Sequence, residues 1–454
     1  MAIFATKFWI MIVLKFGGTS VGNAVNIKKV SDIIYGYSEP KIVVLSAVAG
    51  TTNSLVAINE AIANLQPKEA LKRIDALEQS YLPLLNELFS EEQFLNKAGT
   101  FLQNQFNHLR SLSGNIVNEK EILAQGELIS TNLFQIYQEE LGRDSALIPA
   151  LDYMAIDAHG EPVSKAISAK LDALIKRWPK TTTFITQGYI CLNNLGEIDN
   201  LKRGGSDYSA SLIGAAIKAS EIQIWTDIDG MHNNDPRYVE NTFSIDEMSF
   251  DEAAELAYFG AKILHPQSII PAQKNNIPVL LKNTFNPSDK GTLIRNGSIP
   301  TGVRAIAAKD GITAIKIKSY RMLMAYGFLK KIFEIFEKYH TAIDMITTSE
   351  VAVSLTIDNT KNLRDILEEL GPLGKIEVDS NMSIICLAGD FDQDGKGISA
   401  QVINCLKEVP LRMISYGGSN YNMSLLIATD DKIRSLKLLN EGLFEKRLLE
   451  ATGH

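Results

Sequence analysis

The stretch IMIVLKFGGTSVGN, residues 10–23, joins an apolar run to a turn of small residues. Runs rich in Ile and Val are typical of strands buried on both faces of a parallel sheet. The runs KIVVLSAVAG at 41–50, TTFITQGYI at 182–190 and EIQIWTDIDG at 221–230 have the same form. Helical spacing fills much of 54–142 and 206–219 between them. Strands that alternate with helices predict an α/β domain with a mainly parallel sheet.

The pattern changes near residue 300. The segments DGITAIKIKS at 310–319 and VAVSLTID at 351–358 alternate between apolar and polar residues, which predicts half-buried antiparallel strands. An apolar stripe predicts a helix between them. A similar order of strand, helix and strand recurs after residue 380. We therefore expect a large domain over 11–296 and two small α+β units, over 297–378 and 379–454.

Composition limits the function classes. The chain has 454 residues and a formal net charge of -8, so no basic excess is available to neutralise nucleic-acid phosphates. No apolar run approaches the length of a transmembrane helix, so no membrane partner is expected. The three cysteines, Cys191, Cys386 and Cys405, are far apart and lack metal-ligand spacing. Reduced thiols in a cytoplasmic protein are the natural interpretation.

The turn after the first strand carries candidate phosphate chemistry. Gly17 and Gly18 permit close approach of the backbone to an anion, and the hydroxyl of Ser20 adds a donor. Lys15 could offset charge on a transferring phosphoryl group. The order of residues is neither a Walker A loop nor G-x-G-x-x-G. Taken alone, this stretch could equally be an ordinary turn between a strand and a helix.

The stretch LKRGGSDYSA, residues 201–210, places Gly204 and Gly205 between opposite charges. A surface turn would explain the glycines. It would not explain Arg203, whose guanidinium could hold a carboxylate through two parallel hydrogen bonds. Asp207 could be a helix N-cap, or it could organise Lys15 and other cations around reacting phosphates.

One further loop, one helix and one internal segment complete the set. The turn-rich segment after Trp225 contains Asp227 and Arg237 and lacks the closing Glu of an EF-hand, so a nucleotide-contacting loop fits it better. Residues 246–266 predict one helix, near whose end Lys262 is either an ordinary C-terminal charge or a contact to ATP. Glu127 lies in a segment that looks internal, where a carboxylate would be paired or would bind a substrate amino group.

Taken in order, the motifs KFGGTSV, SAVAGTTN, GELIS, RGGSD, TDIDG…DPR and LAYFGAKILHP resemble the aspartokinases of the amino-acid kinase family. They span residues 11–294, and the remainder resembles the paired ACT regulatory domains of these enzymes. The resemblance implies a three-layer α/β/α sandwich followed by two ferredoxin-like ACT domains. It also implies ATP-dependent phosphorylation of the side-chain carboxylate of L-aspartate to 4-phospho-L-aspartate, the step that opens lysine, threonine and methionine synthesis.

The resemblance assigns roles by position. Lys15 and Asp207 match the catalytic pair, and Mg²⁺ should arrive with ATP rather than in a protein metal site. The matches to aspartate-binding positions are Thr52, Glu127, Arg203 and Ser206. The matches to ATP-binding positions are Gly17, Gly18, Ser20, Thr226, Asp227, His232, Arg237 and Lys262. This sequence departs from the family at Lys202, where glycine is usual, and at His232, where tyrosine is common.

The segments 345–358 and 412–426 resemble the lysine-sensitive class of aspartokinases. The matches to its effector site are Met322, Phe328, Leu329, Asp344, Ser349 and Glu350. They could instead be ordinary solvated or capping residues of an ACT unit. The resemblance implies inhibition by L-lysine and a homodimer through the ACT domains, with a tetramer as a further state. Another amino-acid kinase, of the acetylglutamate or glutamate 5-kinase type, and an inactive ACT amino-acid sensor are the alternatives.

Overall fold

The structure, a computed structural model, describes residues 10–113, 119–202, 204–259, 264–297, 301–322, 326–391 and 397–452. The chain forms two compact units. The first unit comprises Met1–Gly230, Asp246–Phe250 and Leu264–Asn296, and the second comprises Met231–Ile245, Asp251–Ile263 and Gly297–His454. Among the described helices, none is long and apolar enough to cross a membrane.

An eight-stranded sheet forms the centre of the first unit, in the order β3-β4-β2-β1-β7-β9-β10-β8. Neighbouring strands are parallel except for β9 and β10, which are antiparallel. The strands are β1 (Ile12–Phe16), β2 (Lys41–Leu45), β3 (Ala146–Leu147), β4 (Thr183–Gln187), β7 (Glu221–Thr226), β8 (Glu247–Ser249), β9 (Val279–Asn283) and β10 (Thr292–Arg295). A separate hairpin pairs β5 (Ile190–Leu192) with β6 (Ile198–Asn200). The predicted α/β domain with a mainly parallel sheet is confirmed.

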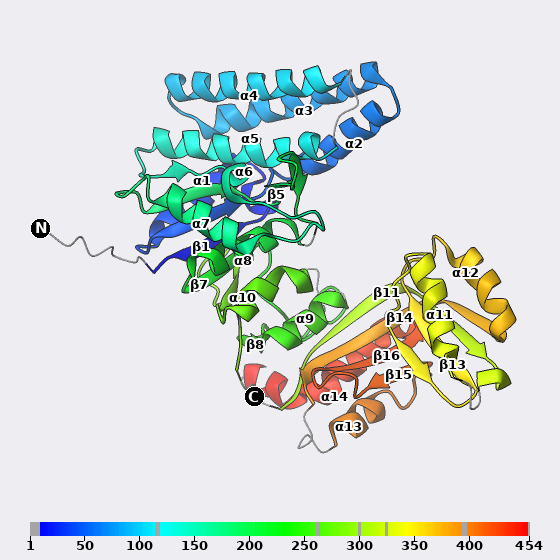
Figure 1. The fold of residues 1–454 in the computed structure, drawn as a ribbon. Coiled ribbons are helices and arrows are strands. Elements are labelled where there is room, and N and C mark those ends of the chain that lie inside the picture. Colours follow the sequence, from blue (N-terminus) through cyan, green and yellow to red (C-terminus); the bar gives the residue numbers. More distant parts are fainter. Residues whose placement is uncertain are drawn as a thin grey trace, which may run out of the picture. The chain divides into compact units, whose positions relative to one another are not determined.

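Helices surround this sheet (Figure 1). They are α1 (Ala24–Gly36), α2 (Thr51–Ala63), α3 (Pro67–Leu88), α4 (Glu92–Leu112), α5 (Glu119–Glu140), α6 (Ala150–Tyr153), α7 (Ser164–Ile175), α8 (Gly205–Ile217) and α10 (Ile270–Lys274). α5 packs against β2, β3 and β4, whereas α8 packs against β1, β2 and β7. The long helices α3 and α4 lie side by side next to α5 (Figure 1).

The alternation of side chains along β1 determines where the site lies. Leu14 and Phe16 belong to the core cluster that also contains the apolar faces of α1 to α5. Because successive side chains of a strand point to opposite faces, Lys15 points toward the face that α8 covers. The whole strand is buried, so the lysine ammonium is held inside the unit.

A six-stranded antiparallel sheet, β12-β13-β11-β14-β16-β15, forms the second unit. Its strands are β11 (Gly302–Lys318), β12 (Ile346–Thr348), β13 (Ala352–Ile357), β14 (Lys375–Asp390), β15 (Met413–Tyr416) and β16 (Asn422–Ala428). Its helices are α11 (Phe328–Lys338), α12 (Leu363–Leu370), α13 (Ile398–Cys405) and α14 (Lys432–Thr452). The predicted α+β regulatory region is confirmed, and it has an antiparallel sheet.

Two long strands divide this sheet into halves. Residues 312–318 of β11 pair with 375–382 of β14, beside β13, and we call this the first regulatory half. Residues 302–309 of β11 pair with 384–390 of β14, beside β16, and we call this the second regulatory half. Register shifts separate the two regions of pairing. Each half has its own apolar core.

Parts of the stretch predicted as a large domain over 11–296 pack in the second unit. The backbone N–H of Ile306 on β11 donates to the carbonyl of Asn233 at 2.8 Å, and the side-chain amide of Asn233 donates to Oδ1 of Asn440 on α14 at 2.8 Å. Val239 belongs to the same core cluster as Leu436. The regulatory sheet therefore holds a segment that begins immediately after the TDIDG loop.

The helix predicted over 246–266 is wrong in extent. The structure has strand β8 at Glu247–Ser249 and then α9 at Phe250–Tyr258. Met248 pairs with Ile294 of β10 and is fully buried, so sheet pairing determines the conformation of a segment whose acidic residues resemble a helix start.

Candidate active site

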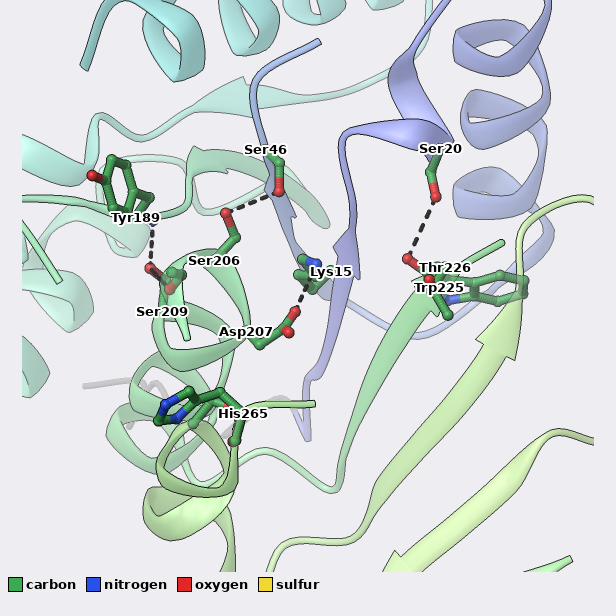
Figure 2. A network of polar contacts seen from close by, with 12 residues as sticks. Lys15, Ser20, Ser46, Tyr189, Ser206, Asp207, Ser209, Trp225, Thr226 and His265 are labelled. Carbon is green, nitrogen blue, oxygen red and sulfur yellow. Dashed lines mark hydrogen bonds and ion pairs between the residues drawn. The ribbon is translucent and has the colours of Figure 1, made fainter. Parts of the chain in front are cut away.

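An ion pair between Lys15 and Asp207 forms the centre of the candidate site. Nζ of Lys15 on β1 lies 2.6 Å from Oδ1 of Asp207 on α8, and both side chains are largely buried (Figure 2). Helix α8 begins at Gly205 after Gly204, whose φ is +69°, so Asp207 stands in the first turn and is not the N-cap. A carboxylate there interacts favourably with the helix dipole while it holds the ammonium.

The loop after β1 is packed too closely for side chains. A Cβ atom on Gly18 would lie 2.9 Å from the carbonyl oxygen of Ala47, and one on Gly17 would lie 3.5 Å from Nζ of Lys15. Glycine is therefore required at Gly18, and at Gly17 it leaves the backbone open beside the ammonium. This arrangement suits an anion that approaches both main chain and cation.

Ser206 lies next to the ion pair and binds a residue that follows β2. Its hydroxyl accepts a hydrogen bond from Oγ of Ser46 at 2.9 Å (Figure 2). Ser206 also packs closely on the end of β4, because a Cβ atom on Gly188 would lie 2.4 Å from its Cβ and Oγ. The carboxyl ends of β1, β2 and β4 thus meet at the start of α8, where parallel α/β sheets bind ligands.

Glu127 on α5 is buried, and its two carboxylate oxygens have different surroundings. Oε1 accepts from the backbone N–H of Ala47 at 3.3 Å, whereas Oε2 is buried with no hydrogen-bond partner among the described residues. Burial raises the pKa of this carboxyl from its usual 4.5 to about 7, against the lowering effect of the Ala47 N–H. A carboxylate in this state would gain a strong interaction with a cation.

The remaining predicted residues of the first unit take different positions. The hydroxyl of Ser20 is fully buried and bonds internally, to Oγ1 of Thr284 at 2.7 Å and to the carbonyl of Trp225 at 3.4 Å. Thr226 donates to Oδ1 of Asp227 at 3.0 Å at the end of β7. Thr52 is exposed in the first turn of α2.

Two predicted ATP contacts, His232 and Arg237, belong to the second unit. Nδ1 of His232 lies 3.1 Å from the hydroxyl of Thr242. The guanidinium of Arg237 makes hydrogen bonds of 2.6–3.1 Å to both carboxylate oxygens of Asp235, although its side chain is 70% exposed. A phosphate would have to share or replace Asp235 as the partner of this arginine.

The six predicted effector residues all lie in the second unit, in or beside the first regulatory half. Phe328 is in the core of this half, and Met322 and Leu329 pack against it. Ser349 and Glu350 are exposed. The side chain of Asp344 is fully buried in an ion pair with Lys309, at 3.1 Å. Asp344 is therefore not a solvated side chain, unlike Ser349 and Glu350.

Arg203 and Lys262 lie outside the described residues. Among the residues that are described, no group of three His, Cys, Asp or Glu side chains lies close enough together to hold a metal ion.

Sequence reasoning missed several residues that shape the site. Ser46 binds Ser206, and the backbone of Ala47 contacts both Gly18 and Glu127. The sequence identified SAVAGTTN only as one of the motifs that resemble the family. Its small residues were the available signal, because they permit such close packing.

Both parts of the chain match known protein families. The amino acid kinase family matches residues 11–283, and an ACT domain matches residues 385–443. The lysine-sensitive aspartokinase 3 of Escherichia coli is 34% identical over 96% of this chain and 99% of its own. The crystal structure of E. coli aspartokinase III with aspartate and ADP has a TM-score of 0.81 at 33% identity, covering 96% of this chain and all of the other. Its structure with lysine and aspartate has a TM-score of 0.80 at 33% identity, covering 96% and 99%.

The chain therefore belongs to the amino acid kinase family, in its aspartokinase branch with a C-terminal ACT region. Membership of this branch makes it an enzyme, an ATP-dependent kinase.

Proposed function

We propose that the protein transfers the γ-phosphoryl group of ATP to the side-chain carboxylate of L-aspartate, giving 4-phospho-L-aspartate and ADP. The observation that carries this proposal is the Lys15–Asp207 ion pair beside Gly17 and Gly18 at the carboxyl ends of β1 and β2. The E. coli relative that binds aspartate and ADP supports the choice of substrates.

The chemistry needs charge neutralisation and alignment rather than a general base. The acceptor carboxylate is already ionised at neutral pH, so one of its oxygens attacks the γ-phosphorus while the bond to the ADP oxygen breaks. Lys15 offsets the negative charge on the transferring group, and Asp207 keeps its ammonium in place. Mg²⁺ arriving with ATP would supply further neutralisation of the phosphates.

Substrate recognition follows from the same residues. We propose that Glu127 binds the ammonium group of aspartate, because its buried Oε2 has no donor among the described residues. Arg203, Ser206 and Thr52 complete the proposed aspartate site. The proposed ATP contacts are Gly17, Gly18, Ser20, Thr226, Asp227, His232, Arg237 and Lys262.

Regulation by L-lysine is the second part of the proposal. It rests on the positions of Asp344 and its neighbours in the ACT region, and on the lysine-bound E. coli relative. We propose a homodimer through the ACT domains, with a tetramer as a further state. We also propose the domain division into 11–296, 297–378 and 379–454. A cytoplasmic location belongs to the same proposal, supported by three free cysteines.

The test is ATP turnover by the purified protein with L-aspartate, L-glutamate or N-acetylglutamate, each titrated with lysine and with threonine. We expect turnover with aspartate alone, suppressed by lysine. Lys15→Ala should abolish it, whereas Lys28→Ala, which removes an exposed lysine of α1 that donates to the carbonyl of Glu87, should leave it intact.

The other outcomes separate the alternatives. Turnover with glutamate or N-acetylglutamate would identify a different amino-acid kinase. Turnover with aspartate that lysine does not affect would retain the kinase and remove the effector. Lysine binding without turnover for any acceptor would favour an inactive sensor.

A further inference from the structure

Two side chains that have been given no functional role so far, Tyr258 and Lys309, hold Asp344 in place. Its Oδ1 accepts a hydrogen bond from the hydroxyl of Tyr258 at 2.6 Å and another from Nζ of Lys309 at 3.1 Å. Nζ of Lys309 also lies 2.8 Å from the carboxylate of Asp358 and 4.4 Å from the centre of the Tyr258 ring. The four side chains form one cluster, which we call the Asp344 cluster, with two carboxylates and one ammonium.

The Asp344 cluster is arranged to receive a further cation. The side chain of Asp344 is fully buried, and its Oδ2 has no hydrogen-bond partner among the described residues. With one ammonium facing two carboxylates, the cluster carries a net negative charge of one. Tyr258 is 42% exposed and the Lys309 side chain 20% exposed, so both partners are more accessible than the carboxylate that they hold.

Tyr258 is also the last residue of α9, so the cluster holds the end of a helix. The same helix is fastened at Glu255, whose Oε2 accepts from the side-chain amide of Asn422 on β16 at 2.6 Å. α9 is thus hydrogen-bonded to both regulatory halves. The chain continues from Tyr258 toward the segment that contains Lys262, a proposed ATP contact.

We propose that Tyr258 and Lys309 compete with the effector ammonium for Asp344, and that Tyr258 thereby couples effector binding to the position of α9. This inference rests on the proposed regulation by lysine and adds the residues that set its threshold. Because the Asp344 side chain is fully buried, a ligand ammonium reaches its Oδ2 only when the Tyr258 hydroxyl or the Lys309 ammonium gives way. When Tyr258 gives way, the end of α9 loses its hydrogen bond to the first regulatory half. The two equilibria are linked reciprocally: lysine binding weakens the Tyr258–Asp344 contact by the same factor by which that contact weakens lysine binding.

The test compares lysine binding and lysine inhibition in four full-length proteins. Tyr258→Phe removes one oxygen and retains the ring. Because hydrogen bonds to charged groups are among the stronger ones, we expect the dissociation constant for lysine, measured by titration calorimetry, to fall about tenfold. The half-inhibiting lysine concentration, measured relative to each protein's own turnover without lysine, should fall in parallel. Lys309→Met should also tighten lysine binding, since it removes the competing cation.

Tyr339→Phe is the matched control. Its hydroxyl donates to a carboxylate, that of Glu369, at the same 2.6 Å and in the same regulatory half, away from Asp344. It should leave lysine binding unchanged, and thermal unfolding should show that all four proteins are folded.

The outcomes distinguish this inference from the proposed function. If wild-type protein turns over aspartate and binds lysine, but Tyr258→Phe binds it with the wild-type or a weaker constant, the competition is wrong and the regulation stands. If neither the wild-type protein nor Tyr258→Phe binds lysine, the proposed effector fails and the inference fails with it.

Discussion

Replacing Glu127 by Gln should remove a specific dependence of stability on pH. The buried Glu127 carboxyl has a pKa of about 7 in the folded chain and 4.5 when solvated, mainly because burial disfavours its charged form. Wild-type protein therefore gains stability from the neutral carboxyl below pH 4.5, and loses it as the pH rises through about 7. The glutamine variant has no such loss.

The magnitude follows from the two pKa values. A rise from 4.5 to about 7 corresponds to about 3 kcal/mol of unfolding free energy once both states are ionised. At about pH 8 the unfolding free energy of Glu127→Gln relative to wild type should be higher by about that much. At about pH 5 it should be higher by less than about 1 kcal/mol. Any cost of burying the new amide is the same at both pH values, so it cancels when the two differences are compared.

The assay is urea unfolding of both proteins, without substrates, at a series of pH values between these limits. Glu119→Gln, an exposed position in the first turn of the same helix, is the control and should show no such trend. A constant difference between Glu127→Gln and wild type across the series would refute the reasoning, because it would mean that the carboxyl ionises as it does in water.

Three further changes test other contacts. Lys15→Met should lower kcat for aspartate phosphorylation by about 10²–10³-fold, because it removes a preorganised charge from the transferring group, and an unchanged kcat would exclude Lys15 from the chemistry. Gly188→Ala places a methyl group against Ser206 and should lower the unfolding free energy by about 1–3 kcal/mol, measured by denaturant titration, unless the start of α8 moves freely. Asn440→Ala removes the acceptor for the side-chain amide of Asn233 and should lower the unfolding free energy by about 2 kcal/mol. A thermal shift smaller than that of an exposed Asn→Ala change would contradict its buried role.

Much of the fold follows from local patterns in the sequence. The runs that contain Leu14, Val43 and Ile185 are buried on both faces, and continuous apolar strands are diagnostic of a parallel sheet. The same reasoning is wrong for the segment around Met248, where an acidic start resembles a helix. Its pairing with Ile294 is nonlocal, and no local pattern reports it.

Some residues of the candidate site could likewise be predicted from the sequence, and others could not. Gly18 and Asp207 could be selected from the sequence because their residue types limit what they can do. Ser46 and Ala47 offered only their small size as a signal, since their contacts use a backbone N–H, a carbonyl and one short hydroxyl. The partners of Asp344 were also beyond prediction, because Tyr258 is 86 residues away along the chain.

Strand β11 has a consequence for how the regulatory region can be dissected or exchanged. Its residues 302–309 complete the second regulatory half, although they precede the whole of the first half in the chain. A cut after residue 378 would therefore leave β14 of the C-terminal fragment paired only with β16, and residues 302–309 of β11 in the N-terminal fragment without a partner strand. The two halves are interlocked, and neither can be transplanted as a cassette. A chimera that exchanges the regulatory region would have to replace both halves together.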